Sequence, residues 1–315
     1  MSSRHQLFLY CIVLSVLFLF PYLPLVNNYI LHIFILTLIY VVLALSLNVV
    51  IGFAGLLDLG FIAFYGIGAY TTAILITRGY SFWVTMILGI IISLIFRFII
   101  GMTTLRLRGD YLAIVTLGFG EIVRIVLNNN PFLLTNGPLG ISSIPAPQIA
   151  GFILSSRISS YYLILIICLI TFYIVMRLEH SKISRMWEAV RENEDAASSC
   201  GINVFLMKIS SYLLAAVFAP IAGSFFAQYQ KFVSPESFNF FESITIVCIV
   251  VLGGMGSIPG VICGSFIIAI MNELLRDLAQ YRMLAFGLIL VCVMIFKPDG
   301  LIGFKRYTFE VKDRR

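Results

Sequence analysis

Residues 29–50 of this chain read YILHIFILTLIYVVLALSLNVV, and this stretch decides the fold. It contains no Lys, Arg, Asp or Glu, and apolar side chains would cover every face of a helix built from it. About 20 such residues form a helix long enough to cross the hydrocarbon core of a bilayer. The stretch therefore predicts a membrane-spanning helix.

The uncharged region extends beyond this one helix, because it runs from residue 5 to residue 57. It is interrupted at Pro21, Pro24, Asn27 and Asn28, which predicts an earlier span near residues 7–26. That first apolar run has no convincing small-residue cleavage site, so we interpret it as a retained helix rather than a signal peptide.

Similar runs fill most of the 315-residue chain, which is 60% hydrophobic and only 11% charged. Soluble domains carry about 25% charged residues, so this composition excludes a soluble protein. The runs do not alternate as the strands of an outer-membrane barrel do. The fold class is therefore all-α polytopic membrane protein. Further spans are predicted near residues 60–77, 82–101, 111–128, 160–178, 209–229 and 282–297.

The stretch 241–275 does not fit a single span. As one helix it would be roughly 50 Å long at 1.5 Å per residue, well over the ~30 Å hydrocarbon core. It is interrupted by Gly253, Gly254, Gly256, Pro259 and Gly260. We expect a broken element, either two short crossings or a re-entrant hairpin.

Basic residues indicate the orientation. Five of the 21 Lys and Arg residues lie in 177–208 and six in 297–315. This clustering is typical of cytoplasmic segments and argues against a nucleic-acid partner; the expected surroundings are a lipid bilayer. Placing both segments in the cytoplasm predicts about ten crossings with both termini cytoplasmic.

This layout divides the chain into four parts. Residues 1–178 form an N-terminal half of about six crossings, and residues 179–208 form a cytoplasmic loop. Residues 209–298 form a C-terminal half of about four crossings, with the break in 241–275. Residues 299–315 form a basic cytoplasmic tail.

Signatures of catalysis and of cofactor binding are missing from the sequence. It has no GxxxxGK[ST] phosphate loop, no HExxH and no nucleophile elbow. Its three His residues and six Cys residues are scattered without ligand spacing. We therefore expect no catalytic residues, no cofactor, no metal and no enzymatic activity of the chain itself.

A weak internal repeat accompanies the spans. Gly52 and Gly55 precede one glycine-containing helix, and Gly253, Gly254 and Gly256 precede another about 200 residues later. Corresponding interrupted segments in two halves of a transporter point to a translocation pathway. Close packing of helices in lipid is the alternative, and glycine spacing alone favours it.

Three charged residues are candidates within or beside the spans. Asp58 precedes a predicted helix, and we favour a capping role for it over substrate contact. Glu121 and Arg124 are three residues apart, so they share a helix face and are expected to pair inside the bundle. Such a pair either locks helices together or acts as a gate.

The loop between the two halves predicts two short helices. Ser184 could cap the first, which would run through Arg191, and Asn193 could cap the second. Glu194 and Asp195 would then lie at the positive end of the second helix. Ala196 and Ala197 follow, and Gly201 is placed to end it. The result is either a solvated connector or an Ala-faced helix that docks a soluble partner.

The run at 192–203, ENEDAASSCGIN, followed by Lys208, resembles the cytoplasmic EAA-type loop of ABC importer permeases. Almost the whole chain resembles the branched-chain amino acid permeases of the LivM type. The matching stretches are 52–74, 105–130, 135–146, 251–265 and 296–304.

The resemblance implies two sets of site residues. The set expected to couple to an ATPase is Glu188, Arg191, Glu192, Glu194, Asp195, Ala196, Ala197, Gly201 and Asn203. The candidates for the translocation pathway are Gly52, Gly55, Asp58, Glu121, Arg124, Gly253, Gly254 and Gly256.

The resemblance also implies a function and a set of partners. The chain would be the permease subunit of an ATP-driven importer of leucine, isoleucine and valine in a prokaryotic cytoplasmic (inner) membrane. Its partners would be a second, LivH-like permease, two cytoplasmic ATPase subunits and an extracytoplasmic substrate-binding protein. Related permeases handle urea, short amides or other amino acids. An autonomous channel or ion-coupled carrier is the further alternative.

Overall fold

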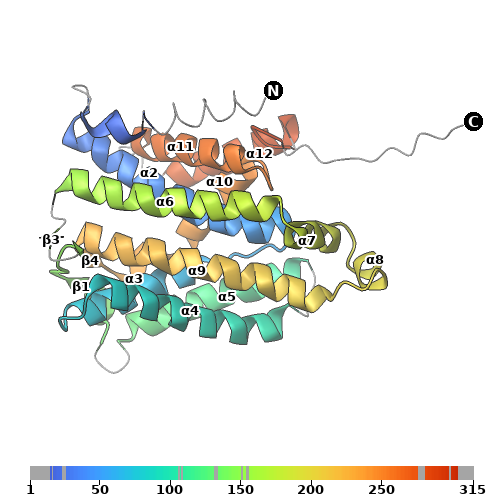
Figure 1. The fold of residues 1–315 in the computed structure, drawn as a ribbon, viewed down its shortest axis with the longest axis horizontal. Coiled ribbons are helices and arrows are strands. Elements are labelled where there is room, and N and C mark those ends of the chain that lie inside the picture. The colour runs from blue at the N-terminus through green and yellow to red at the C-terminus, as the bar shows by residue number, and fades with distance from the viewer. Residues whose placement is uncertain are drawn as a thin grey trace, which may run out of the picture.

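The computed structural model describes residues 15, 17–22, 26–105, 107, 109–130, 134–149, 152–153, 156–275, 281–297 and 299–303. Within these residues the chain is a bundle of helices that run along one common direction (Figure 1). Most of the span expected near 7–26, and residues 304–315 of the expected tail, lie outside the described part.

Most of the bundle consists of apolar helices of different lengths. The first, α2 (Asn28–Asn48), continues into η2, a π-helical turn (Val49–Phe53). The others are α3 (Ile62–Ile76), α4 (Phe82–Thr104), α5 (Asp110–Asn128), α6 (Arg157–Glu179), α9 (Val204–Gln230), α10 (Phe240–Gly253), α11 (Ile258–Leu274) and α12 (Arg282–Phe296).

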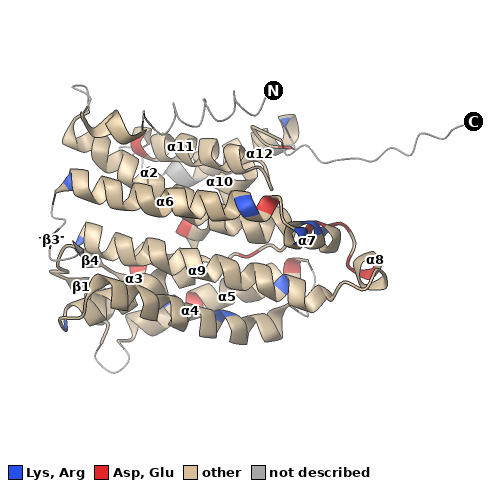
Figure 2. Cartoon of the chain, viewed as in Figure 1, with Lys and Arg blue, Asp and Glu red and all other residues tan. Residues whose placement is uncertain are grey.

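Two short helices, α7 (Lys182–Glu192) and α8 (Glu194–Ser199), project from one end of the bundle, which we call the α7–α8 end (Figure 1). The opposite end, here the strand end, carries the short connections: η4 (Gly137–Leu139), η5 (Pro235–Phe238), β1 (Ile141–Ser142), β2 (Gln148–Ile149), β3 (Phe152–Ile153) and β4 (Phe232–Val233). β1 pairs antiparallel with β4, and β2 with β3. Charged residues gather on α7 and α8, whereas the middle of the bundle is mostly uncharged (Figure 2).

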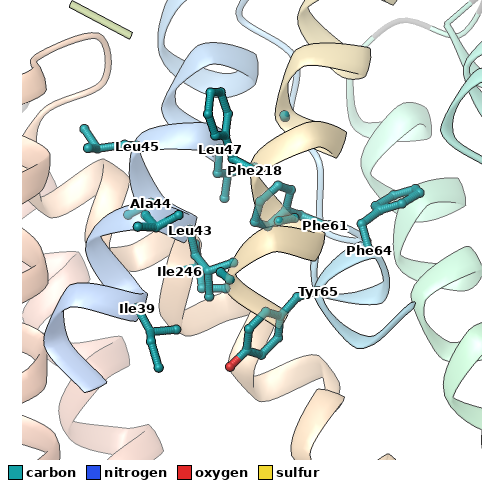
Figure 3. Close-up of a cluster of buried hydrophobic side chains, with 14 of the residues drawn as sticks. Ile39, Leu43, Ala44, Leu45, Leu47, Phe61, Phe64, Tyr65, Phe218 and Ile246 are labelled. Carbon is teal, nitrogen blue, oxygen red and sulfur yellow. The ribbon is translucent and has the colours of Figure 1, made fainter. Parts of the chain in front are cut away.

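Helix α2 lies at the centre of the bundle, in contact with α6, α9, α10 and α11. Figure 3 shows Leu43 and Leu47 of α2 in one cluster with Phe218 of α9 and Ile246 of α10. Lipid tails are as apolar as Leu, so burial of α2 brings no large hydrophobic gain over exposure to lipid. What holds these helices together is close packing, which depends on shape.

Glycines permit that packing where α3 meets α9. A Cβ added to Gly68 would lie 2.7 Å from Cβ of Pro220, and one added to Gly223 would lie 2.9 Å from N of Ala69. Real Cβ atoms do not approach this closely, so a larger residue would push the helices apart. For Gly68, which lies in the helix that follows Gly52 and Gly55, the packing interpretation is therefore correct.

The break expected within 241–275 is present. Helices α10 and α11 pack against each other and are joined by a turn in which Gly254 and Gly256 have φ values of +111° and +94°. Ser257 begins α11 by accepting a hydrogen bond from N of Gly260. With 14 and 17 residues the two helices are about 21 and 26 Å long, shorter than a typical span.

In the part of the chain that the structure describes, five segments are long and apolar enough to cross a membrane: Asn28–Phe53, Phe82–Thr104, Arg157–Glu179, Val204–Gln230 and Pro235–Gly253. Three apolar helices are shorter: Ile62–Ile76, Ile258–Leu274 and Leu284–Val293. The polytopic helical class is confirmed, while the count of ten crossings stays a prediction.

Replacing Gly68 by Ala tests the packing argument. We expect the variant to lose about 1–3 kcal/mol of stability, because the added methyl group overpacks the contact with α9. The matched control is Gly118→Ala on α5, where an added Cβ meets no atom within 4 Å. Retention of a monodisperse peak after heating in detergent measures the difference, and equal stability of the two variants would contradict it.

Candidate coupling and translocation site

Helix α7 begins one turn earlier than the sequence suggests. Ser181 is its N-cap and accepts a hydrogen bond from N of Ser184. The prediction that Ser184 caps this helix is therefore wrong: Ser184 lies inside the first turn and is buried. Both serines suit a cap by residue type, and burial decides between them. Glu188, half-buried, and Glu192, exposed, also lie on α7.

Helix α8 is capped at both ends as predicted. The side chain of Asn193 accepts hydrogen bonds from N of Asp195 and N of Ala196. At the other end, Gly201 adopts φ +83° and donates to O of Ser198, while N of Ile202 donates to O of Ala197. This pair of bonds is the Schellman arrangement, which needs the left-handed residue that glycine provides.

The expected Ala face of α8 is only half exposed. Ala197 is 4% exposed and packs inward, whereas Ala196 points outward together with Asp195, Ser198 and Ser199. The prediction of an Ala-faced docking helix is therefore corrected to an acidic and small polar face. Ala197 is turned inward because a helix of six residues has one side against α7 and α9.

Side chains fasten α8 and α7 to the start of α9. Nζ of Lys208, which is 3% exposed, lies 2.6 Å from Oε1 of Glu194. Trp187 of α7 donates from Nε1 to O of Met207 and to Oγ of Ser210, both on α9. Asn203 caps α9 by accepting from N of Leu206. These contacts therefore link α7 and α8 to the first turns of α9.

The candidate coupling and pathway residues meet at Arg191. Its Nη1 donates a hydrogen bond to the carbonyl oxygen of Gly52 in η2. A Cβ added to Gly55, whose φ is +70°, would lie 2.5 Å from Cγ of Arg191. The last turn of α7 thus rests on the glycine segment that ends α2.

The two halves of the internal repeat meet at the same place. N of Gly256 donates to Oδ1 of Asn48 over 2.9 Å, and a Cβ added to Gly52 would lie 2.5 Å from N of Gly256. The segments around Gly52 and Gly256, far apart in sequence, therefore touch through backbone atoms. Sequence reasoning related them by pattern and did not identify Asn48, the side chain that joins them.

Residues 299–303 cover the break between α10 and α11. N of Leu301 donates to O of Leu252, and N of Ile302 donates to O of Gly253. Gly300 lies against Gly254, with no room for a side chain on either. Two of the stretches that carry the family resemblance, 251–265 and 296–304, are therefore in direct contact.

Asp58 forms a buried ion pair that the sequence did not reveal. Its Oδ2 accepts from Nη2 of Arg97 on α4, and the two side chains are 0% and 1% exposed. Nε of Arg97 donates to O of Tyr212 on α9, and the guanidinium carbon lies 3.8 Å from the centre of the Tyr212 ring. The pair therefore ties α4 and α9 to the irregular segment before α3.

The predicted capping role of Asp58 is replaced by this pair. Oδ1 of Asp58 accepts from N of Gly60, but the N-cap of α3 is Phe61, which makes no side-chain cap bond. A signal was available, because an Arg in a predicted span needs an anionic or aromatic partner. Asp58 lies 39 residues before Arg97 in the sequence, so spacing along the chain did not identify it as the partner of Arg97.

Glu121 and Arg124 pair as predicted, with 2.9 Å between Oε2 and Nε. They are 30% and 27% exposed, so the expectation of a pair inside the bundle is wrong. Nη1 of Arg124 also lies 3.0 Å from Oε1 of Glu236 in η5, at the strand end. Glu121 and Arg124 do not lie at the contact between the Gly52 and Gly256 segments. Within the described residues, no three His, Cys, Asp or Glu side chains gather as metal ligands.

Comparisons with known proteins identify the class of this bundle. The profile described as branched-chain amino acid transport system, permease component, matches residues 29–296. The chain therefore belongs to this family of permeases.

Individual relatives agree with the profile. The chain is 43% identical over 300 residues to the high-affinity branched-chain amino acid transport system permease protein LivM of Salmonella typhimurium, covering 88% of this chain and 70% of the relative. It is 42% identical over 302 residues to LivM of Escherichia coli, covering 88% and 71%. The permease protein LivH of Escherichia coli is 27% identical over 144 residues, 44% of this chain and 46% of LivH. No solved structure matches the chain.

The buried ion pair makes a strong prediction for stability. Arg97→Met should lower the free energy of unfolding by about 3–5 kcal/mol, because Asp58 is left charged, buried and unpaired. The double variant Asp58→Leu with Arg97→Met should recover most of that loss. Chemical denaturation in detergent measures both.

Glu121→Gln is the matched control, since it breaks a partly exposed pair that contributes at most about 1 kcal/mol. If Arg97→Met and Glu121→Gln had the same free energy of unfolding, the buried pair of Asp58 and Arg97 would not be a main source of stability.

Proposed function

We propose that this chain is a permease subunit of an ATP-driven importer of branched-chain amino acids, working by alternating access. The observation that carries the proposal is the contact of Arg191 with Gly52, in a chain that belongs to the permease family. It joins the loop that resembles an ATPase-docking segment to a glycine-rich break in the bundle.

The orientation follows from the same loop. With α7 and α8 in the cytoplasm, the α7–α8 end faces the ATPases and the strand end faces outward. The basic residues around α7 support this placement by the positive-inside bias. The membrane is then the cytoplasmic membrane of a prokaryote, and ATP hydrolysis occurs on partner chains.

Two routes carry motion from the docking loop into the bundle. The first runs from Arg191 to Gly52 and, through Asn48, to Gly256 at the break between α10 and α11. The second runs from Glu194 to Lys208 on α9, and one turn further from Tyr212 to Arg97 and Asp58. Both routes end at irregular backbone, where a helix can change direction without breaking regular hydrogen bonds.

The partners follow from the kind of relative found. LivM and LivH of Escherichia coli are named as permease proteins of one kind of system, and this chain is similar to both, more strongly to LivM. We propose that it pairs with a LivH-like permease, that two ATPases bind the α7–α8 loops, and that an extracytoplasmic protein delivers substrate. The exposed acidic face of α8 suits a groove with basic and small residues.

Arg191→Ala tests the coupling route. In proteoliposomes that contain the complete importer, we expect uptake to fall at least tenfold while ATP hydrolysis persists, because docking remains and the link to Gly52 is lost. Arg185→Ala is the matched control, since Arg185 is exposed on the same helix. Equal uptake by both variants would rule out this route.

Substrate and energy source need a separate measurement. We expect leucine, isoleucine and valine uptake to require ATP, both permeases and the binding protein, with urea and short amides taken up far more slowly. Faster ATP-driven uptake of urea or acetamide than of these amino acids would instead identify the chain as an amide permease of the same importer class. Transport by this chain alone without ATP would identify a channel or carrier instead.

A further inference from the structure

One face of α5 is left uncovered by the rest of the described chain. Its side chains Ile114, Ile122, Ile125 and Val126 are between 47% and 64% exposed. Gly118 lies four residues from both Ile114 and Ile122, so the three residues share one side of the helix. We call these five residues the α5 face.

The exposed surfaces of two other long helices differ from the α5 face in charge. Arg97 is the one charged residue of α4, and it is buried. Helix α6 has no charged residue between Arg157 and Arg177. Both surfaces therefore suit lipid tails. Beside the α5 face, by contrast, Glu121 and Arg124 are 30% and 27% exposed.

The carboxylate of Glu121 lies close to the middle of its helix. Glu121 follows the first residue of α5 by eleven positions and precedes the last by seven. At 1.5 Å per residue it is about 16 Å from one end of α5 and about 10 Å from the other. A charge at such a depth is costly in lipid, and these residues face protein or a water-filled cavity instead. Lipid is therefore a poor cover for this side of α5.

Irregular backbone beside α5 supports the same conclusion. Residues 54–61 form neither helix nor strand, and Leu57 among them is 37% exposed. N of Leu59 donates to Oγ1 of Thr116, which lies six residues into α5, about 9 Å from its start. Non-helical backbone at membrane depth is tolerated where protein or water covers it, and not where lipid does.

The space at Gly118 is open. Gly68 and Gly223 lie against neighbouring helices of this chain, whereas a Cβ added to Gly118 meets no atom of the described residues within 4 Å. Small residues let two helices approach closely in a membrane. A helix of a partner could therefore pack against α5 at Gly118, with its side chains between Ile114 and Ile122.

Charge favours a partner that differs from this chain. Arg124 lies 2.9 Å from Glu121 and 3.0 Å from Glu236, so two carboxylates share one guanidinium and leave one net negative charge. Two copies of this chain that met through α5 about a two-fold axis would bring two such clusters together, and like charges repel. A related permease with a basic residue at this level would be attracted.

From these observations we propose that the α5 face is the surface through which this chain packs against the LivH-like permease. Gly118 allows the close approach of a partner helix, and a basic residue of the partner lies opposite Glu121 and Glu236. The ATPases and the binding protein lie outside the membrane and do not reach the middle of α5. The inference rests on the proposed function for the existence of this partner.

Photo-crosslinking tests the surface. In membranes that contain the complete importer, with different tags on the two permeases, p-benzoylphenylalanine replaces either Ile122 on α5 or Ile170 on α6. The two positions are similarly exposed, at 59% and 52%. We expect irradiation to link this chain to the LivH-like permease from position 122, with a yield about tenfold or more above that from position 170.

A substitution at Gly118 separates association from folding. Gly118→Leu fills the open space, so the amount of LivH-like permease that co-purifies should fall about tenfold. The purified chain alone should remain as stable as the unaltered protein, because the new side chain points into open space. Gly287→Leu is the matched control: Gly287 is equally open, and α12 lies on the far side of the bundle from α5 (Figure 1). It should not change co-purification.

Four results would overturn the inference: a higher yield from position 170 than from 122, a link from 122 to a second copy of this chain, a link from 122 to lipid alone, or full co-purification of Gly118→Leu. Each of these together with ATP-driven leucine uptake would leave the proposed function intact. A link from 122 to the LivH-like permease in membranes that take up no leucine would support the surface and count against the proposed function.

Discussion

Everything at the α7–α8 end depends on one steric constraint, the absence of a side chain at Gly52. Its backbone lies against Asn48 and Gly256 on one side and accepts a hydrogen bond from Arg191 on the other. A methyl group there would overlap Oδ1 of Asn48, which fixes the turn between α10 and α11. Three segments of the chain thus converge on a point that admits only backbone, so none of them can move independently of the other two.

Charged side chains are paired differently inside the bundle and at its strand end. Inside the bundle, Arg97 is neutralised by Asp58 and covered by Tyr212 and Phe64, because an unpaired charge in an apolar bundle is very costly. At the strand end, Arg124 shares two carboxylates at a partly exposed surface, where such pairs are weak.

Local rules predicted much of the fold from the sequence. Helix α5 starts within one residue of its expected position, and Asn193, Gly201 and Ser257 mark helix ends as their residue types indicate. The failures are of two kinds. Ser181 and Ser184 are both good caps, and only burial distinguishes them. The other failures are contacts between separate elements. Asp58 pairs with Arg97, Glu194 with Lys208, and Arg191 with the carbonyl of Gly52, and hydropathy and residue spacing do not indicate which elements pack together.

The buried ion pair also has a consequence for biogenesis. An Arg at the centre of a lone helix costs about 2.5–3.5 kcal/mol to insert into a membrane. Asp58 is synthesised 39 residues before Arg97, so the carboxylate is already present when α4 leaves the ribosome. Pairing with Asp58 offsets this cost, so α4 inserts more favourably beside a segment that has been delivered first. One contact of the finished bundle thereby favours one order of assembly.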